Sequence, residues 1–335
     1  MPDTVEADLE KILHGSPLEG EQVEVCDFTL EDYNEALESQ GIQPRVDANF
    51  MPAASTTYIV AVVMLNQDNE VLMMQEAKKT CAGKWYLPAG RMEKNETIVE
   101  AAKREVLEET GLEIECTGLL MVESASGFWF RFVLTGVATG GELKTPARAD
   151  KESLQAKWIK NLDELSLRAL DIIPLIDRAK LYKTAKETND SSWHKDQLPA
   201  LRPHAKLLLR LVIVIKKKAT NRVHILISEK NCWHIPTCEI HPTKSLHSTI
   251  RKFMIDLFGA EVPTHKLCGI LSVEHNPVND EEGMCLTMLV AFRSPLEEVP
   301  IIGKCVWHET SKSLGDDLLQ RVASKNSTIF LHVLR

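Results

Sequence analysis

Short apolar runs separated by polar turn residues dominate the chain after residue 55. Residues 58–65 read YIVAVVML, residues 71–75 read VLMMQ, and the polar residues 67–69 stand between them. Apolar runs of this length with turn residues at their ends are typical of buried strands, so this pair predicts a β-hairpin. The same pattern predicts strands over 119–122, 129–135 and 155–159 and a mostly helical segment over 165–183.

One helix with defined ends is predicted among these strands, from near Ile98 to Gly111. Thr97 followed by Glu100 is a capping box, in which each side chain accepts a hydrogen bond from the other residue's backbone amide. Gly111 follows the last charged turn and suits the left-handed conformation that often ends a helix. The apolar side that can pack on a core carries Val99, Ala102 and Val106.

The polar side of this predicted helix is acidic. Glu105, Glu108 and Glu109 are spaced i, i+3 and i+4, so they share one face and repel one another. Mg²⁺ prefers carboxylate and water oxygens, and it is usually shared with substrate phosphates. Arg104 can pair with Glu108 at i, i+4. The face is therefore either a divalent-cation site or a solvated acidic surface, and the surrounding spacing favours the first.

That spacing runs from Gly90 to Leu112 and reads G-x5-E-x7-R-E-U-x-E-E-x-G-U, in which U is an apolar residue. Its supporting positions outside the acidic face are Gly90, Glu96, Arg104 and Gly111. This pattern is the Nudix box, and through it the chain resembles the Nudix hydrolase family. The resemblance implies hydrolysis of a diphosphate linkage and an α/β/α sandwich with a mixed sheet, whereas periodicity alone predicts only an α/β (α+β) protein.

The resemblance also implies roles for the acidic face. In the family, carboxylates of this helix bind Mg²⁺ or Mn²⁺, and a backbone carbonyl just before the box glycine helps. Carried over to this chain, the metal ligands are Glu105, Glu108, Glu109 and the Ala89 carbonyl, and the general base is Glu105 or Glu108. A further family acid often precedes the strand that contains Trp158. Glu152 is the nearest match, and Asp150 and Glu123 are alternatives.

The second half of the chain repeats the first in outline. WHIP at 233–236 echoes WYLP at 85–88, and a shift of 148 residues brings Gly111 onto Gly259 without a gap. Such internal similarity indicates a repeated unit. In that register Cys238 replaces Gly90, Lys244 replaces Glu96, Phe253 replaces Glu105, Asp256 replaces Glu108 and Leu257 replaces Glu109. A lone aspartate cannot hold a metal cluster, so the sequence predicts a degenerate Nudix-like domain without catalysis.

These patterns divide the chain into four parts. Residues 1–55 are acidic and weakly patterned and are predicted to be a partly flexible extension, with one short helix capped by Thr29 and ending near Gly41. Residues 56–184 form the predicted catalytic domain. Residues 185–204 are rich in turn formers and predict a linker. Residues 205–335 form the degenerate domain.

Composition and charge limit the partners. A net charge of −9 argues against general binding to nucleic acid or to anionic membranes. The sequence contains no apolar run long enough to predict a membrane span, and its acidic N-terminus lacks the basic region of a signal peptide. Eight cysteines without a C-x2-C pair suit reduced thiols, so we expect a cytoplasmic protein, with the nucleus possible. Cys232, His234, Cys238 and His241 are zinc-ligand types, but their spacing fits no common finger.

The substrate is predicted from a narrower resemblance. QEAKKTCAGKWYLPAGRME, WFRFVLTG, TGGELKT and GMCLTMLVAFRSP are similar to segments of the metazoan MutT homologues that act as 8-oxo-dGDP phosphatases. This implies hydrolysis of oxidised purine nucleoside diphosphates to monophosphate and phosphate, which sanitises the nucleotide pool. Candidate substrate contacts are Leu72, Tyr86, Asp171, Phe128 and Trp129. The alternatives are a Nudix pyrophosphatase for nucleotide sugars or dinucleotides and a non-catalytic nucleotide-binding module.

Overall fold

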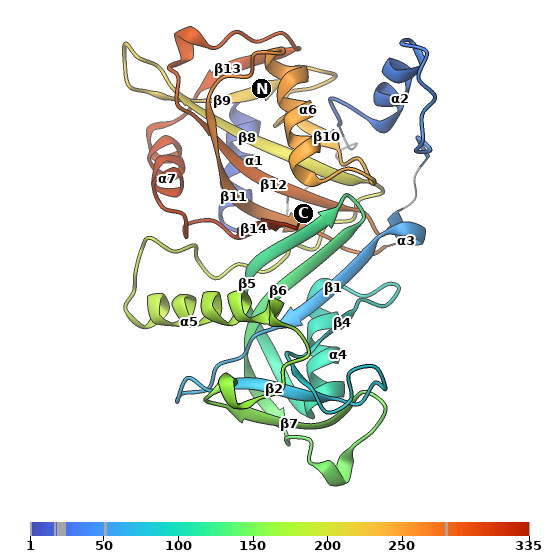
Figure 1. The fold of residues 1–335 in the computed structure, drawn as a ribbon. Helices are drawn as coiled ribbons and strands as arrows, with labels where there is room; N and C mark the ends of the chain where they lie inside the picture. The colour runs from blue at the N-terminus through green and yellow to red at the C-terminus, as the bar shows by residue number, and fades with distance from the viewer. Residues whose placement is uncertain (1, 17, 19–24, 50–51, 279–280, 335) are drawn as a thin grey trace. The chain divides into compact units, whose positions relative to one another are not determined.

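A computed structural model describes residues 2–16, 18, 25–49, 52–278 and 281–334 of the chain (Figure 1). It is a mixed α/β protein that divides into two compact units. One unit contains residues 57–123 and 130–198, and we call it the box unit. The other contains residues 1–56, 124–129 and 199–335, and we call it the second unit. No described helix is both long enough and apolar enough to cross a membrane.

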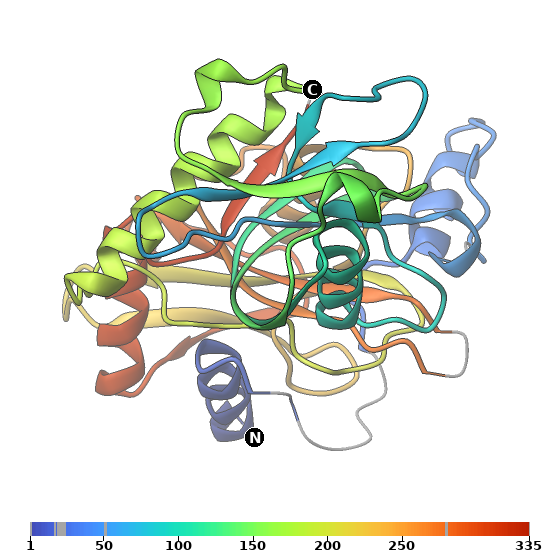
Figure 2. The ribbon, with the colours of Figure 1, turned by 90° about the horizontal axis from the view of Figure 1, so that it is seen from below.

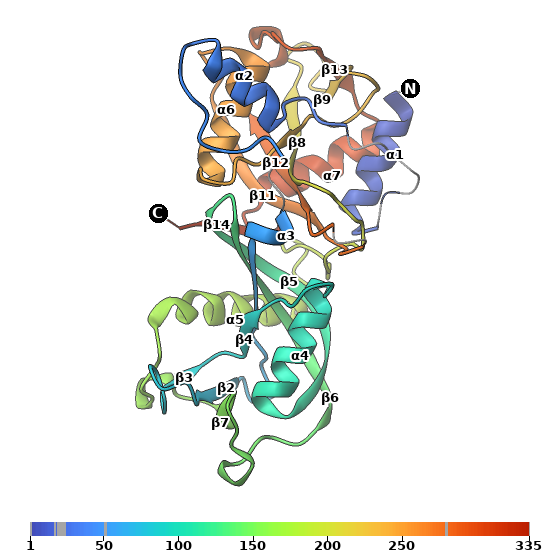
Figure 3. The ribbon, with the colours of Figure 1, turned by 90° about the vertical axis from the view of Figure 1, so that its right-hand side faces the viewer.

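The box unit places its helices around two small sheets. One contains β5 (Leu112–Ser126), β6 (Trp129–Gly141), β1 (Thr57–Val62) and β4 (Ala89–Arg91) in that order, and the other contains β3 (Trp85–Tyr86), β2 (Val71–Glu76) and β7 (Ser153–Ile159). The helices are α4 (Ile98–Thr110) and, after a short 3-10 turn over Leu170–Ile172, α5 (Ile173–Glu187). Figure 3 shows α4 and α5 on opposite sides of the strands.

The second unit is built on a six-stranded sheet. Its strands are β11 (His265–Glu274), β12 (Met284–Phe292), β8 (Leu207–Lys216), β9 (Val223–Ser228) and β13 (Cys305–Glu309) in that order, with β10 (Thr237–Glu239) paired to β8. Its helices are α1 (Pro2–Leu13), α2 (Leu30–Glu38), α3 (Pro52–Ser55), α6 (Leu246–Phe258) and α7 (Lys312–Ala323), and β14 (Phe330–Val333) follows α7. Figure 3 shows α6 on one face of the sheet and α1 and α7 on the other.

The two units repeat the same local structure in the predicted register. Helices α4 and α6 are each 13 residues long and begin 148 residues apart, at Ile98 and Leu246. Their N-terminal caps are Thr97 and Ser245, and their C-terminal caps are the positive-φ glycines Gly111 and Gly259. Strands β4 and β10 are separated by the same interval, from Ala89–Arg91 to Thr237–Glu239. The second half of the chain therefore repeats the fold around the box.

The predicted helix ends are confirmed, but two expectations require correction. Thr97 and Glu100 form the capping box, and Gly111 has a φ of 78°. The hairpin predicted over 58–65 and 71–75 is confirmed only at its turn, where Leu65 and Val71 form an antiparallel bridge and the Leu72 amide donates to the Met64 carbonyl at 3.0 Å, whereas β1 and β2 themselves lie in different sheets. The Asn66 side chain folds the connection by accepting bonds from the amides two and four residues later.

The second correction concerns the amino-terminal residues. Residues 1–55 are expected to be an extension, but α1 packs into the core of the second unit through Val5, Leu9 and Ile12, which are at most 1% exposed. Figure 2 shows α1 beside α7, where Arg321 Nη2 donates to the Leu13 carbonyl at 3.0 Å. Burial of this apolar face, rather than local pattern, positions the helix.

Candidate active site

The acidic face of α4 meets the short strand β4. Gly90 of β4 pairs with Val60 of β1, which fixes the strand beside the helix. A Cβ atom at Gly90 would lie 2.0 Å from Glu105 Oε1, so the carboxylate of Glu105 rests directly on the glycine backbone. One turn later, Glu109 Oε2 accepts a hydrogen bond from the Ala89 amide at 2.9 Å. The glycine of the motif is therefore required for the close approach of a carboxylate.

Arg104 organises the remaining carboxylates. Its Nε and Nη2 donate to the two oxygens of Glu96 at 2.7 and 2.8 Å. Its Nη1 donates to Glu105 Oε1 at 2.8 Å and to Glu108 Oε2 at 3.2 Å. The two-pronged bond to Glu96 fixes the guanidinium plane, so Arg104 orients both glutamates of the helix face. These contacts place Glu96 and Arg104 in the supporting positions that the sequence pattern predicts.

Burial gives this site an unusual electrostatic state. Burial, followed by the nearby charge of Glu108, raises the pKa of Glu105 even though Arg104 opposes the shift. Burial raises the pKa of Glu109 well above its usual range, and the charge of Glu105 adds to this effect. Carboxylates that are crowded together out of water are stabilised by a nearby cation. Their hard oxygen atoms are also the ligands that Mg²⁺ and Mn²⁺ prefer.

Two residues near this face are Glu76, the last residue of β2, and Lys78, in the segment that follows. Lys78 lowers the pKa of both Glu105 and Glu109 through its charge, whereas Glu76 raises the pKa of Glu109. Glu76 is fully buried, and its Oε1 accepts a bond from Arg168 Nη1 at 2.6 Å. Its Oε2 has no hydrogen-bond partner within the described parts of the chain. This carboxylate oxygen remains available beside the acidic helix.

A second polar group joins Tyr86 to Asp171. Tyr86 Oη donates to Asp171 Oδ2 at 2.9 Å, and Arg131 Nη1 lies 3.1 Å from the former and 2.7 Å from the latter. Arg131 Nε also donates to the buried carboxylate of Glu123. The guanidinium of Arg168 lies 4.6 Å from the centre of the Tyr86 ring. Because Arg168 also binds Glu76, it links this group to the buried carboxylate beside the helix face.

Comparison with known proteins shows the family. Residues 56–177 match the model of the NUDIX domain. The 8-oxo-dGDP phosphatase NUDT18 of Danio rerio is 34% identical over 95% of this chain and 94% of its own length. The chain belongs to the Nudix hydrolase family.

A second relative supports the same assignment. NUDT18 of Homo sapiens, an 8-oxo-dGDP phosphatase, is 37% identical over 79% of this chain and 84% of its own length. A NUDIX hydrolase structure from Nitrosomonas europaea is similar at 28% identity and a TM-score of 0.33, covering 38% of this chain and 90% of that one. As a Nudix hydrolase, the protein acts on phosphoanhydride bonds.

The predicted substrate residues lie in different parts of the structure. Tyr86 and Asp171 are in contact, and the Asp171 side chain is 43% exposed, so it can meet a ligand. Asp171 Oδ2 accepts bonds from Tyr86 Oη and Arg131 Nη1. Leu72 is fully buried in β2 opposite Trp158, and its side chain is part of the core. Phe128 and Trp129 belong to the second unit.

The further acids expected before Trp158 each have a partner in the structure. Asp150 Oδ2 accepts a bond from Lys144 at 2.8 Å, and Asp150 Oδ1 accepts bonds from the backbone amides of Glu152 and Ser153. The Glu152 carboxylate lies 3.4 Å from Lys151. Glu123 pairs with Arg131. Lys144 also donates to the Glu108 carbonyl, and Ser153 Oγ donates to the Glu109 carbonyl at 2.6 Å, so this segment lies at the end of the Nudix helix. Glu76 is a further acid near the helix, and the sequence signal for it is a carboxylate that directly ends an apolar strand.

Other metal-ligand types gather outside the Nudix box. In the described part of the chain, only His204, Glu274 and Cys285 bring three ligand atoms within 4.8 Å of one another. Arg210 Nη1 already binds Glu274 at 2.8 Å, and this fixed positive charge disfavours a cation there. The four possible zinc ligands near residue 235 do not form such a group in the described structure. His234 instead pairs with Asp27 at 3.1 Å.

Proposed function

We propose that this Nudix hydrolase converts oxidised purine nucleoside diphosphates, such as 8-oxo-dGDP, to the monophosphate and phosphate. We assign the reaction to residues 56–184. The observation that carries the substrate is the 34% identity to an 8-oxo-dGDP phosphatase across 95% of the chain. This similarity extends over the degenerate second half of the chain and is therefore not limited to the Nudix box. Hydrolysis of such diphosphates sanitises the nucleotide pool.

The donor set fits a divalent cation. Glu105, Glu108 and Glu109 would hold Mg²⁺ or Mn²⁺ together with the Ala89 carbonyl, because these groups are hard oxygen donors and two of the carboxylates are buried beside like charges. When bound, the cation lowers the pKa of a bound water and neutralises phosphate charge. The contacts of Arg104 with Glu105 and Glu108 keep their carboxylates on one side of the helix.

The chain's own residues then supply proton transfer and substrate orientation. Glu105 or Glu108 takes the proton of the attacking water at a carboxylate oxygen. Water adds to the terminal phosphorus, and the bond from that phosphorus to the bridging oxygen breaks, which leaves a monophosphate and inorganic phosphate. Tyr86 and Asp171 form the polar wall that meets the base, because their contact leaves the Asp171 carboxylate partly exposed.

A matched substrate panel tests this proposal. The full chain is assayed with Mg²⁺ against 8-oxo-dGDP, 8-oxo-dGTP, dGDP and ADP-ribose, and released phosphate and diphosphate are measured separately. We expect phosphate from 8-oxo-dGDP with a kcat/KM at least about tenfold above that for the other three, which corresponds to about 1.4 kcal/mol of discrimination. Equal or faster turnover of ADP-ribose would overturn the assigned substrate and support a pyrophosphatase for nucleotide sugars or dinucleotides.

The close approach of Glu105 to Gly90 gives a prediction for Gly90→Ala. The new Cβ would meet the Glu105 carboxylate at 2.0 to 2.4 Å, so this flexible end of the side chain must move. A displacement of this size in a catalytic group can cost about 10²-fold in rate. We expect kcat/KM to fall by about that factor while the thermal midpoint changes by no more than about 3 °C, measured by phosphate release and by circular dichroism. Unchanged turnover would show that Glu105 need not rest on Gly90.

A further inference from the structure

The second unit has a cavity at the place of the Nudix box. Its volume is about 520 Å³, and its walls come from α2 with the segment before it, β10 and α6. Four lining residues occupy box positions in the register of the repeat: Cys238 for Gly90, Lys244 for Glu96, Phe253 for Glu105 and Asp256 for Glu108. The degenerate unit has therefore kept a hollow where the catalytic unit places its carboxylates.

The residues that line this cavity differ in charge from those at the matching positions of the Nudix box. A carboxylate of the box is replaced by the ammonium of Lys244, and another is replaced by the ring of Phe253. The remaining acid, Asp256, forms an ion pair with Lys252 one turn earlier on α6. Of the three box glutamates on the helix, only Glu108 has an acid, Asp256, at the matching position, so the second unit lacks the acidic helix face of the Nudix box.

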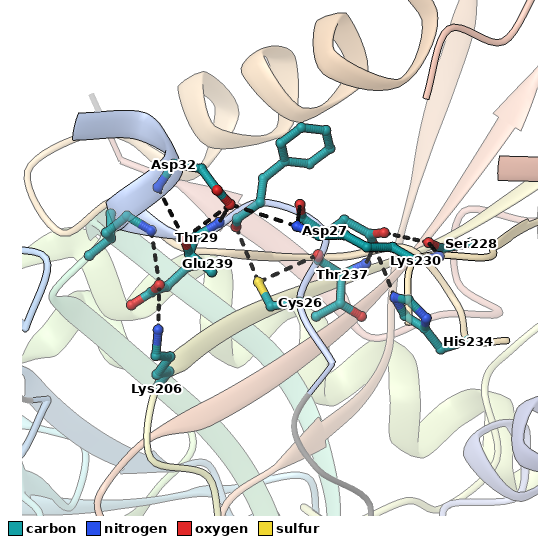
Figure 4. A network of polar contacts seen from close by, with 12 residues as sticks. Cys26, Asp27, Thr29, Asp32, Lys206, Ser228, Lys230, His234, Thr237 and Glu239 are labelled. Carbon is teal, nitrogen blue, oxygen red and sulfur yellow. Dashed lines mark hydrogen bonds and ion pairs between the residues drawn. The ribbon is translucent and has the colours of Figure 1, made fainter. Parts of the chain in front are cut away.

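The amino-terminal segment closes one side of the cavity, and its buried Asp27 accepts hydrogen bonds from other parts of the second unit. Phe28 forms a parallel bridge with Cys238. Asp27 is 6% exposed and accepts bonds from the Thr237 amide at 2.7 Å, from Ser228 Oγ at 2.5 Å and from His234 (Figure 4).

The other lining carboxylates are engaged in the same way. Glu239 Oε2 accepts bonds from Lys206 Nζ and from the Leu30 amide, each at 3.0 Å (Figure 4). Asp32 Oδ2 accepts a bond from the Thr29 amide at 2.8 Å and lies 3.9 Å from Lys230. Each carboxylate that lines the cavity thus lies beside a lysine or histidine nitrogen of the protein.

One lining cation has no such partner. Lys244 is exposed and forms no ion pair among the described residues, so its charge is available to a ligand. The adjoining wall is aromatic, since the Tyr33 and His241 rings are 4.9 Å apart with an interplanar angle of 74°. The hydroxyl of Thr249, which also lines the cavity, is buried with no hydrogen-bond partner in the described structure. Rings, an unpaired ammonium and a free hydroxyl form a mixed apolar and anion-binding surface.

We propose that this cavity binds a small phosphorylated ring compound, of the nucleoside monophosphate class, without a metal ion. Its flat base meets the rings of Tyr33 and His241, and its phosphate meets Lys244. Cavities of roughly 300 to 1,000 Å³ suit ligands of this size, and Lys is a common point-charge partner of phosphate. Lys244 thus occupies the position that corresponds to Glu96 of the Nudix box, and its ammonium can bind phosphate directly. This inference does not depend on the substrate of the box unit.

The test measures GMP binding to the full chain in EDTA by titration calorimetry, in the Glu105→Gln, Glu108→Gln background that removes turnover. We expect one saturable site for GMP and a Kd at least tenfold weaker after Lys244→Glu, which restores the acid found at this position of the box. Lys312→Glu, an exposed lysine of α7 outside the cavity, is the matched control and should change the Kd by less than twofold. Amide NMR should place the GMP-induced shifts at His241, Ser248 and Thr249.

Several results would overturn the proposal. GMP that fails to saturate the chain by about 10 mM, which corresponds to a free energy weaker than about 2.7 kcal/mol, would show that the cavity does not bind this class. An equal Kd for the wild type and Lys244→Glu, or shifts confined to residues 57–123 and 130–198, would place the site elsewhere. Orthophosphate binding as tightly as GMP would indicate a simple anion site, and guanosine binding as tightly would exclude a phosphate contact.

Discussion

The double variant Glu105→Gln, Glu108→Gln is expected to fold and to lose at least about 10³-fold in kcat, as residues of one catalytic unit do when they are removed together. Glutamine keeps the size of each side chain, and its amide oxygen can still accept the bonds that Arg104 donates to Glu105 and Glu108. The substitution removes two negative charges and the basic oxygen that accepts the proton of water. The double variant therefore tests the catalytic role of the two glutamates without removing their contacts with Arg104.

Phosphate release with Mg²⁺ measures this loss, and circular dichroism establishes that the fold is retained. Glu115→Gln is the matched control, because Glu115 is a 58% exposed glutamate whose partner is the surface residue Lys103. We expect this control to keep its kcat within about twofold, since exposed ion pairs contribute little free energy. A double variant that turns over at the wild-type rate would refute the roles proposed for the two box glutamates.

A second readout of the same variant reports the cation directly. A ligand that binds only the folded state raises its stability by RT ln(1 + [L]/Kd). Mg²⁺ or Mn²⁺ should therefore raise the thermal midpoint of the wild type and leave that of the double variant unchanged. A cation-induced rise of equal size in both proteins would place the metal away from these carboxylates. This outcome is independent of which nucleotide is the substrate.

Local signals account for what could be predicted from the sequence. The cap at Thr97 and the positive φ of Gly111 depend on residues within one turn of each helix end, and both are found as predicted. The register of the repeat is also local, because each unit keeps the cap, the helix length and the closing glycine. The box carboxylates follow from the same pattern, since one helix carries all three. These features need no knowledge of the tertiary packing.

Tertiary contacts account for what could not be predicted. The spacing of Val5, Leu9 and Ile12 is helical, but local sequence does not show which surface covers their apolar face. The predicted hairpin is limited to its turn because the chain leaves one sheet after Val62 and enters another at Val71. Strand pairing of this kind depends on residues far apart in the sequence.

The contacts within the site that the sequence did not predict follow the same rule. Tyr86 and Asp171 are 85 residues apart, and Arg131 reaches both from a third element. One signal was nevertheless present, because Arg131 and Arg210 each interrupt an otherwise apolar strand, WFRFVL and LLLRLVIVI. A charged residue inside such a run must find a buried partner. In the structure each pairs with a glutamate, and those glutamates, Glu123 and Glu274, end two similar sequences, LMVE at 120–123 and LSVE at 271–274.

This buried pairing makes Arg131→Met the substitution with the largest expected effect on stability. The side chains of Arg131 and Glu123 are 8% and 3% exposed, so the variant leaves a carboxylate in the core without its cation. Removal of one partner from a buried ion pair typically costs about 3–5 kcal/mol. Asp171 suffers less, because it is partly exposed and water can replace the lost bond. We expect the free energy of unfolding of the box unit to fall by about that amount.

The double variant Arg131→Met, Glu123→Gln shows whether the loss of stability comes from the unpaired buried charge of Glu123 or from lost packing. Removing the charge of Glu123 should recover most of the stability, because replacement of a whole buried pair by neutral groups is often nearly neutral. Urea unfolding measures the loss of stability, and hydrogen exchange assigns it to residues 57–123 and 130–198. Exchange of the amides around the unaltered Arg210–Glu274 pair of the second unit serves as the internal reference. A double variant as unstable as Arg131→Met would show that packing rather than charge dominates. Because Arg131 also holds Tyr86 and Asp171, a stable double variant with a raised KM for 8-oxo-dGDP would place this pair in support of the base-binding wall.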